Sequence, residues 1–312
     1  MKLFKYLAYK LLTLFSARFL VEKDEKPLIR RRGDIGRTPK RVLFDFSHST
    51  THLGDRLFFL PLMAALQAEG CELLLASNDK LTQPLLDGLL QPPLPMTMAR
   101  ENFSGLVVIQ LPSLLDRYKK YASLLAVDFT DPRCDEGIAQ QLVKSTSQEL
   151  GMPLRQDLPL MLKAPAFSSV LPQEDGGSYF VFSNYIDSGG FRKLFVSESV
   201  LPRKARELRA LGHRIVHVGS ARDKAGDARH YDFVDIDLRG QMRIEDMPGL
   251  LNDPRVQGIV SYDNVFMHLA GLFGKQAFVL FRGRLSRTAY RHHMAHVNNT
   301  FFKNVRLLQY LA

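Results

Sequence analysis

Short apolar runs of strand length alternate with longer, helix-like segments along most of this chain, and this rhythm limits the possible folds more than any other feature. Strands that alternate with helices form mainly parallel sheets with helices on both faces. The stretch APAFSSVLPQEDGG at 164–177 interrupts the rhythm, which then restarts. We therefore predict an α/β protein of two Rossmann-like domains facing a central cleft. The expected strands are 41–46, 71–77, 105–111 and 158–163, then 178–183, 213–220, 231–236, 256–262 and 276–281; the expected helices are 55–69, 79–90, 113–125 and 135–150, then 196–211, 243–251 and 263–273.

Length and composition agree with this division. At 312 residues, 46% of them hydrophobic, the chain can build two cores of ordinary size. Cys71 and Cys134 share no motif spacing, which favours ordinary thiols over a disulfide scaffold. We expect four parts: a basic amphipathic arm and linker at 1–40, an N-terminal domain at 41–165, a C-terminal domain at 175–295, and a helical tail at 296–312 that packs back.

Positive charge is concentrated at the start of the chain. Residues 1–41 hold six Lys and six Arg against two Asp and two Glu, an excess of eight, whereas the whole chain has a net charge of +10. The rest of the chain is therefore close to neutral. This distribution argues against a protein that binds nucleic acid over its whole surface.

The first 20 residues have the period of an amphipathic helix, with apolar side chains on one face and mostly lysines and polar residues opposite. The longest uncharged run, 11–17, is too short to span a bilayer, and the pattern of a cleaved signal peptide is not found. Two interpretations stay open. We favour a helix that binds an anionic membrane surface; the alternative is a helix that packs on its own domain or on a second copy. The apolar face comprises Leu3, Phe4, Leu7, Leu11, Leu14 and Phe15.

Patterns typical of other chemistries are not found in the sequence. No G-x-G-x-x-G follows the first strand of either domain, and GGFRKLF and GLFGK lack the spacing of a P-loop. RHHMAH at 291–296 has two histidines four residues apart but lacks the glutamate base of the zinc-protease pattern. We therefore expect no metal ion and no dinucleotide cofactor.

Polar residues and glycines gather at three expected strand-to-helix junctions. Ligands of open α/β sheets bind beyond the carboxyl ends of the strands, and the start of a helix favours an anion such as a diphosphate. Each candidate also has a structural interpretation: Asp55 and Asp263 as helix caps, His268 as a core histidine, and the cations as a solvated face. The candidates are His52, Gly54 and Asp55 at the first junction, Arg192 and Lys193 at the second, and Asp263, Asn264 and His268 at the third, with Arg282, Arg284, Arg287 and Arg291 after the last strand.

Three motifs resemble those of the heptosyltransferase family, the GT-B-fold glycosyltransferases of lipopolysaccharide core assembly (glycosyltransferase family 9). GDRLFFLP at 54–61 is similar to the family's G-D-x-x-x-x-L-P. VSYDNVFMHLA at 260–270 is similar to V-S-x-D-T-G-x-x-H-L-A, and DLRGQMRIEDMPGLL at 237–251 to a D-L-x-G segment. The matches cover about 41–283 in the right order. The departures are Asn264-Val265 for Thr-Gly, Gln276 for Pro after Gly-Lys, and Phe281-Arg282-Gly283 in the last motif.

The resemblance implies roles for individual residues. Asp55 matches the catalytic base, with His52 and Gly54 beside it on the acceptor side. Lys193 matches the lysine that binds the donor diphosphate, and Asp263, Asn264 and His268 match the donor loop, with Arg282 and Gly283 as further donor-binding residues. The N-terminal domain would then bind the acceptor and the C-terminal domain the nucleotide sugar.

These roles predict an inverting, metal-independent glycosyltransferase. It would move a heptose or hexose from a nucleotide diphosphate sugar, with an ADP-sugar favoured, to a lipopolysaccharide-core or other cell-surface glycan. Other partners are an anionic glycolipid or oligosaccharide acceptor and, through residues 1–20, the inner face of the cytoplasmic membrane; nucleic acid is not expected, and the oligomeric state is left open. The alternatives are a GT-B-fold scaffold without turnover, which the Asn264-Val265 change favours, and a nucleotide-sugar epimerase.

Overall fold

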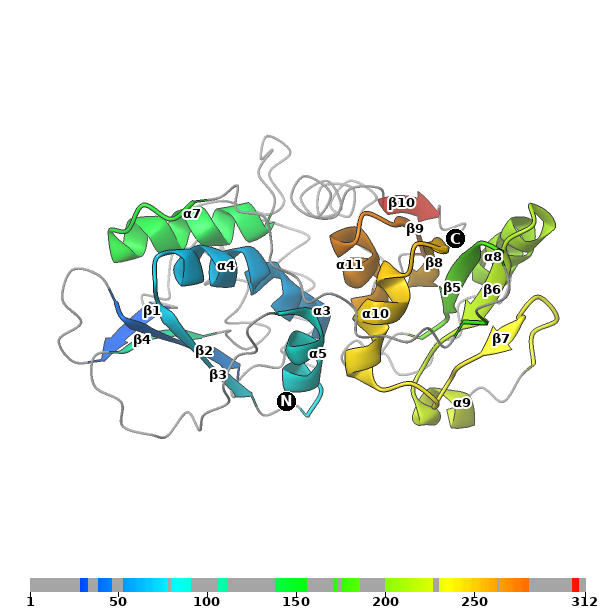
Figure 1. The fold of residues 1–312 in the computed structure, drawn as a ribbon, viewed down its shortest axis with the longest axis horizontal. Helices are drawn as coiled ribbons and strands as arrows, with labels where there is room; N and C mark the ends of the chain where they lie inside the picture. Colours follow the sequence, from blue (N-terminus) through cyan, green and yellow to red (C-terminus); the bar gives the residue numbers. More distant parts are fainter. Residues whose placement is uncertain are drawn as a thin grey trace, which may run out of the picture. The chain divides into compact units, whose positions relative to one another are not determined.

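The computed structural model describes the chain as two compact units. The first comprises Met1–Leu86, Leu90–Met161 and Leu285–Thr300, and the second comprises Asp87–Leu89, Leu162–Arg284 and Phe301–Ala312. Each unit is built around its own sheet (Figure 1). The described residues are 29–32, 39–46, 53–77, 80–90, 106–110, 138–155, 171–172, 176–185, 200–226, 230–262, 264–280 and 305–308.

The first unit contains a four-stranded sheet in the order β1-β4-β2-β3. Strands β2 (Arg41–Phe46), β3 (Glu72–Ser77) and β4 (Leu106–Gln110) are parallel, as the sequence predicts. The edge strand β1 (Ile29–Arg32) runs antiparallel to β4, although the sequence predicts a linker from residue 30 onward. The expectation is wrong for these residues because the free edge of β4 offers backbone partners to any extended segment, and a charged edge strand resists further pairing.

The first helices of the first unit follow β2 in the sequence and begin at Leu53. The sequence predicts one helix over 55–69, but the structure has α3 (Leu53–Arg56), a 3₁₀ turn (Leu57–Phe59) and α4 (Leu60–Ala68). Pro61 explains the break, because it has no N–H to donate to the carbonyl of Leu57. The N–H of Leu60 donates to that carbonyl instead. Helix α4 packs against α7 (Ile138–Leu150), and α5 (Thr82–Leu89) follows β3.

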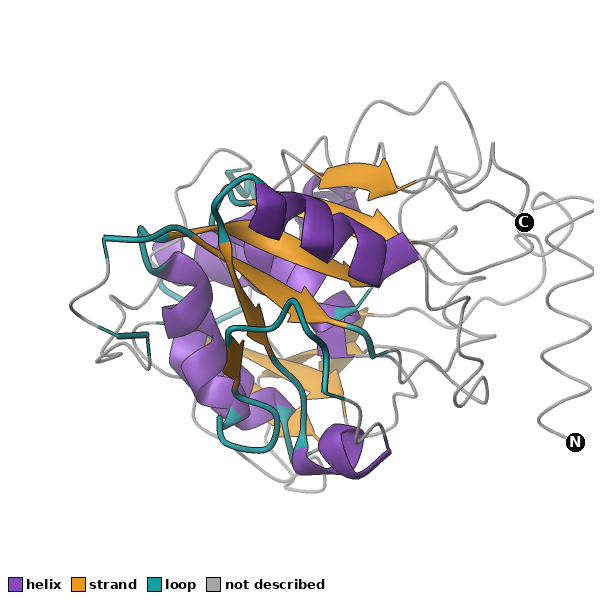
Figure 2. Ribbon diagram, turned by 90° about the vertical axis from the view of Figure 1, so that its right-hand side faces the viewer, coloured by secondary structure: helices purple, strands orange, loops and turns teal. Residues whose placement is uncertain are grey.

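The second unit contains a six-stranded, all-parallel sheet in the order β10-β9-β8-β5-β6-β7. Helices lie against the strands (Figure 2). One apolar cluster joins α8 to four strands and includes Phe180, Phe182, Ile215, Val260 and Leu280. The elements are β5 (Tyr179–Ser183), α8 (Val200–Ala210), β6 (Arg214–His217), α9 (Ala221–Gly226), β7 (Ile236–Asp237), a 3₁₀ turn (Ile244–Asp246), α10 (Met247–Asn252), β8 (Val256–Tyr262), α11 (Val265–Leu272), β9 (Gln276–Leu280) and β10 (Val305–Leu308).

Three elements of the second unit differ from the sequence prediction. Strand β7 is two residues long because 231–234 form a turn, in which the N–H of Val234 donates to the carbonyl of Tyr231. Helix α9 was not expected. The tail was expected to be helical, but β10 pairs with β9 there, so the prediction is wrong for 305–308; an open strand edge can override a weak helical preference. The expected segments 113–125, 158–163 and 1–28 lie outside the described residues.

In the described ranges, none of the helices combines the length and the apolar character that a membrane-spanning segment needs. The two sheets share another property that bears on function. In each, the chain leaves the first parallel strand toward one side and later returns to its other side, between β2 and β4 in the first unit and between β5 and β8 in the second. Such a reversal opens a crevice at the carboxyl ends of the strands, where open α/β sheets bind their ligands.

Candidate functional site

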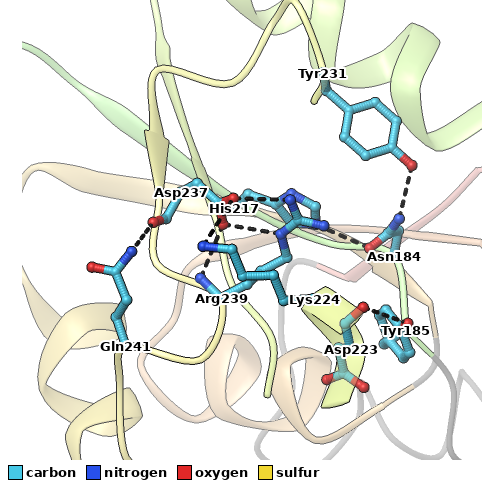
Figure 3. A network of polar contacts seen from close by, with 9 residues as sticks. All are labelled: Asn184, Tyr185, His217, Asp223, Lys224, Tyr231, Asp237, Arg239 and Gln241. Atoms are coloured by element: carbon cyan, nitrogen blue, oxygen red, sulfur yellow. Dashed lines mark hydrogen bonds and ion pairs between the residues drawn. The ribbon is translucent and has the colours of Figure 1, made fainter. Parts of the chain in front are cut away.

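The carboxyl ends of β5, β6, β7 and β8 form one continuous edge in the second unit, because all four strands are parallel. Polar residues lie along this edge, in the segments 183–185, 217–220, 237–241 and 264, each directly at or after the end of a strand. Figure 3 shows part of this set, including Asn184, His217 and Asp237. Hydrogen bonds and ion pairs join neighbouring segments, so we describe the edge from the centre of the sheet outward.

Asn264 joins the ends of the two central strands. Its side-chain oxygen accepts a hydrogen bond from the N–H of Phe266 at 3.0 Å and caps α11. Its side-chain nitrogen donates to the carbonyl of Tyr185 at 2.9 Å and to the hydroxyl of Ser183 at 3.3 Å. The N-cap is therefore Asn264 and not Asp263, and a single amide connects β8–α11 with the end of β5.

Asn184 connects β5 to the next strand. Its side-chain oxygen lies 3.0 Å from Nε2 of His217, and its side-chain nitrogen donates to the hydroxyl of Tyr231 at 3.0 Å. The ring of His217 is fully buried and lies 4.8 Å from that of Phe182, centroid to centroid. Because Asn184 is held from both ends, its orientation is fixed by the protein.

The start of α9 is fixed by a reciprocal pair of hydrogen bonds. The N–H of Ser220 donates to the carboxylate of Asp223 at 2.7 Å, and the N–H of Asp223 donates to the hydroxyl of Ser220 at 3.2 Å. The hydroxyl of Tyr185 donates to the carbonyl of Asp223 at 2.7 Å. The loop after β6 is thereby linked to the end of β5 as well.

A cluster of charges follows β7. Arg239, whose side chain is 4% exposed, binds the carboxylate of Asp237 through Nε at 2.9 Å and Nη2 at 2.8 Å. Lys224 lies 3.9 Å from the same carboxylate, and Gln241 donates to the backbone carbonyl of Asp237 at 2.7 Å. Two cations thus share the carboxylate of Asp237, while the carboxylate of Asp223 lies on the neighbouring loop, so the charges of these four side chains balance.

Gly240 explains the glycine of the D-L-x-G segment. Its φ of +71° lies in the left-handed region, and a Cβ there would come within 2.9 Å of the Cα of Ala221. A side chain at this position would therefore push the loop after β7 away from α9. The N–H of Gly240 donates to the carbonyl of Gly219 at 2.8 Å, so the two loops are joined through their backbones.

The carboxylate of Asp237 is strongly stabilised in its charged form. The hydrogen bonds from the Arg239 side chain, together with the Arg239 N–H and the nearby His217, lower the pKa of Asp237 from 3.8 to about 2, against the opposing effect of burial. Because the pKa of Asp237 is lower in the folded than in the unfolded protein, the charged carboxylate stabilises the folded protein at pH values above the unfolded pKa. This stabilisation is lost as the pH falls through the folded pKa. The stabilisation is therefore complete at neutral pH and lost between about pH 4 and pH 2.

We expect Asp237→Asn to lower the free energy of unfolding by about 1–3 kcal/mol at pH 7, because it removes a charged hydrogen-bond acceptor from a buried guanidinium. The difference from the unmodified protein should shrink as the pH is lowered toward 2. Urea unfolding at a series of pH values measures both quantities. Glu207→Gln, which removes an exposed carboxylate paired with Lys204, is the control and should change little. A difference that stays constant down to pH 2 would contradict the assigned pKa.

In the first unit, α3 is the first helix after β2 in the sequence, and it contains Gly54 and Asp55. Gly54 is buried, and Asp55 lies at the third position of the helix, so it is not the residue that begins it. The next residue, Arg56, is 2% exposed; its guanidinium donates to the hydroxyl of Ser77 at 3.0 Å and lies 5.5 Å from the ring centroid of Phe46. Arg56 thus fixes α3 against the carboxyl ends of β2 and β3.

The structure brings together only part of the set of residues predicted from the sequence. Asn264 caps α11 and His268 is buried one turn further along that helix. Gly54 and the backbone of Asp55 lie in the other unit, after β2. The remaining candidates lie outside the described residues, as does the side chain of Asp55, so their roles stay predictions; they are His52, Arg192, Lys193, Asp263, Arg282, Gly283, Arg284, Arg287 and Arg291.

The sequence analysis does not propose four polar residues that lie at the ends of β5, β6 and β7: Asn184, His217, Asp223 and Arg239. A positional signal was present for three of them, because Asn184, Asp223 and Arg239 come within three residues after an expected strand, whereas His217 lies inside one. It was overlooked because hydrogen-bond partners far apart in sequence, such as Asn184 and His217, are brought together only by strand order. Within the described part of the chain, no group of three His, Cys, Asp or Glu side chains is placed to hold a metal ion.

The sequence matches no protein-family model and no curated protein. Solved structures do match. A family 9 glycosyl transferase from Veillonella parvula superposes with a TM-score of 0.52 at 14% identity, over 87% of this chain and 86% of that one. ADP-heptose LPS heptosyltransferase II from E. coli gives 0.51 at 16% identity, over 87% and 91%. E. coli heptosyltransferase WaaC, solved with ADP, gives 0.50 at 14%, over 86% and 92%. At such identities the likeness establishes the fold: this chain has the two-unit α/β architecture of these glycosyltransferases, the GT-B fold.

Proposed function

We propose that this protein is a glycosyltransferase of the family 9 type, which transfers a heptose or hexose from a nucleotide diphosphate sugar to a lipopolysaccharide-core or related cell-surface glycan. The observation that supports this most is topological. In each unit, one of the family-like motifs follows a strand that borders the reversal point of its sheet: GDRLFFLP follows β2, and the Asp263–His268 segment follows β8. Reversal points are where open α/β sheets bind ligands.

The second unit is the proposed donor site. The start of α11 suits the diphosphate of a nucleotide sugar. The solved relatives support an ADP-sugar, since their names specify ADP-heptose or bound ADP. Lys193 and Arg282 are the proposed side-chain partners of the diphosphate, with Asp263, His268 and Gly283 near the sugar.

The proposed reaction inverts the configuration at the transferred sugar. Asp55, in the first unit with His52 and Gly54 beside it, takes the proton from the acceptor hydroxyl. The hydroxyl oxygen forms a bond to the anomeric carbon as the bond from that carbon to the diphosphate breaks. The cations and the helix start stabilise the charge that develops on the leaving diphosphate. We propose that no metal ion takes part, since positively charged side chains and a helix dipole supply this stabilisation.

We also propose that the enzyme acts at the inner face of the cytoplasmic membrane. The donor would come from the cytosol, and the acceptor would be an anionic glycolipid. The basic, amphipathic residues 1–20 would bind the membrane surface through charge and apolar contact together.

A panel of nucleotides tests the proposal. We expect ADP or an ADP-sugar to raise the melting temperature of the protein by several degrees at a concentration of about 100 Kd, which corresponds to about 2.7 kcal/mol. UDP and GDP should raise it less. EDTA should leave both the shift and the transfer of radiolabelled sugar to deep-rough lipopolysaccharide unchanged. Failure of every nucleotide to bind would contradict the proposal and favour a scaffold, whereas loss of activity in EDTA would contradict only metal independence.

A further inference from the structure

Asn264, at which this sequence departs from the family-like motif, has a structural role. Where the motif has Thr-Gly, this chain has Asn264-Val265. The Asn264 side chain makes three hydrogen bonds to other parts of the protein: its oxygen accepts from the N–H of Phe266, and its nitrogen donates to the carbonyl of Tyr185 and to the hydroxyl of Ser183. The amide therefore spans the reversal point between β8 and β5.

A threonine would not reproduce this arrangement. The amide places an acceptor atom and a donor atom at two different positions, one facing α11 and one facing the end of β5. A hydroxyl has a single oxygen, which can occupy one of these positions and not both. With threonine at position 264, α11 would keep its cap but lose the hydrogen bond to the carbonyl of Tyr185.

The segment that Asn264 holds is connected to the rest of the edge. Ser183 is fully buried, Asn184 binds His217 and Tyr231, and the Tyr185 hydroxyl binds the backbone of Asp223. Tyr185 precedes Lys193 by eight residues in the sequence. The side chain of Asn264 thus connects the start of α11 with the segment Ser183–Tyr185, which precedes Lys193 in the sequence.

We propose that Asn264 is a positioning residue for the donor: it fixes the α11 start and the Ser183–Tyr185 segment relative to each other before the nucleotide sugar binds. This inference rests on the proposed function and assigns Asn264 a role other than direct contact with the donor. A site held in its binding geometry loses less conformational entropy when the ligand arrives, so fixing these two segments strengthens donor binding.

Two substitutions of Asn264 keep the cap of α11 and remove the hydrogen bond to Tyr185. Asn264→Thr keeps a capping oxygen and adds no charge, and Asn264→Asp keeps the shape and the cap but turns an oxygen toward the Tyr185 carbonyl. We expect both variants to melt within a few degrees of the unmodified protein. Both should bind ADP about tenfold more weakly by calorimetry. The KM for the donor should rise while the KM for the acceptor stays the same.

Gln257→Glu is a matched control. This exposed side-chain amide also donates to two backbone carbonyls, those of Pro254 and Arg255, but at the opposite end of β8. It should bind ADP like the unmodified protein. If Asn264→Thr binds ADP with unchanged affinity, the positioning role is refuted although the proposed function stands. If only Asn264→Asp binds more weakly, added negative charge explains the loss and the inference also fails. If the unmodified protein binds no nucleotide, the proposed function fails first.

Discussion

Asp55→Asn is expected to lower kcat for sugar transfer by about 10²–10⁴-fold, the usual contribution of general-base catalysis. The amide has nearly the shape of the carboxylate but cannot take a proton from the acceptor hydroxyl. Asp55 follows β2 at the reversal point of the first sheet, in a different unit from the proposed donor site. ADP binding and the melting temperature should therefore stay close to those of the unmodified protein.

The measurement is a radiolabelled transfer assay with calorimetry on the same preparations. Glu72→Gln is the control, because Glu72 is an exposed carboxylate at the amino end of β3 that pairs with Arg41. It should keep full activity. Asp55→Asn with normal turnover would exclude Asp55 as the base, and a variant that also lost ADP binding would show that Asp55 serves the structure of the site and not proton transfer.

The sequence was sufficient for the strands because burial on both faces of a parallel sheet leaves near-continuous apolar runs. The runs at 41–46, 71–77 and 256–262 coincide with β2, β3 and β8 to within a residue. Patterns within a segment do not reveal edge pairing. The sequence therefore predicts a linker in place of β1 and a helix in place of β10, since both strands owe their conformation to a partner strand.

The contacts of the candidate site could not be predicted from patterns within one segment either. Asn264 was found because it begins a helix after a strand, but its bond to Tyr185 depends on β5 and β8 being neighbours, which strand order determines. The sequence does not indicate that Arg239 is buried, because most arginines in proteins are exposed. The contact with Asp237, two residues earlier, compensates the charge of the buried guanidinium.

Arg239→Ala is expected to destabilise the second unit more than any other single change at the polar edge. The guanidinium is 4% exposed, binds Asp237 through two nitrogens, and its stem lies against Gly219, whose added Cβ would be 3.4 Å from Cγ of Arg239. Removing one partner of a buried pair costs about 3–5 kcal/mol. Because Asp237 is 26% exposed and Lys224 remains nearby, we expect the lower end, about 3 kcal/mol, or a fall in melting temperature of roughly 6–12 °C.

Arg206→Ala is the matched control, since Arg206 also pairs with an aspartate through a hydrogen bond at 3.1 Å, but both side chains are more than half exposed. Exposed pairs contribute about 0–1 kcal/mol, so its melting temperature should change little. Arg239→Lys should lie between the two, because lysine keeps the charge but not the two parallel hydrogen bonds. Equal melting temperatures for the two alanine variants would mean that burial of Arg239 adds nothing to stability. If Arg239→Ala melts as expected but binds ADP normally at 20 °C, the Asp237–Arg239 pair is a structural support of this edge and has no part in donor binding.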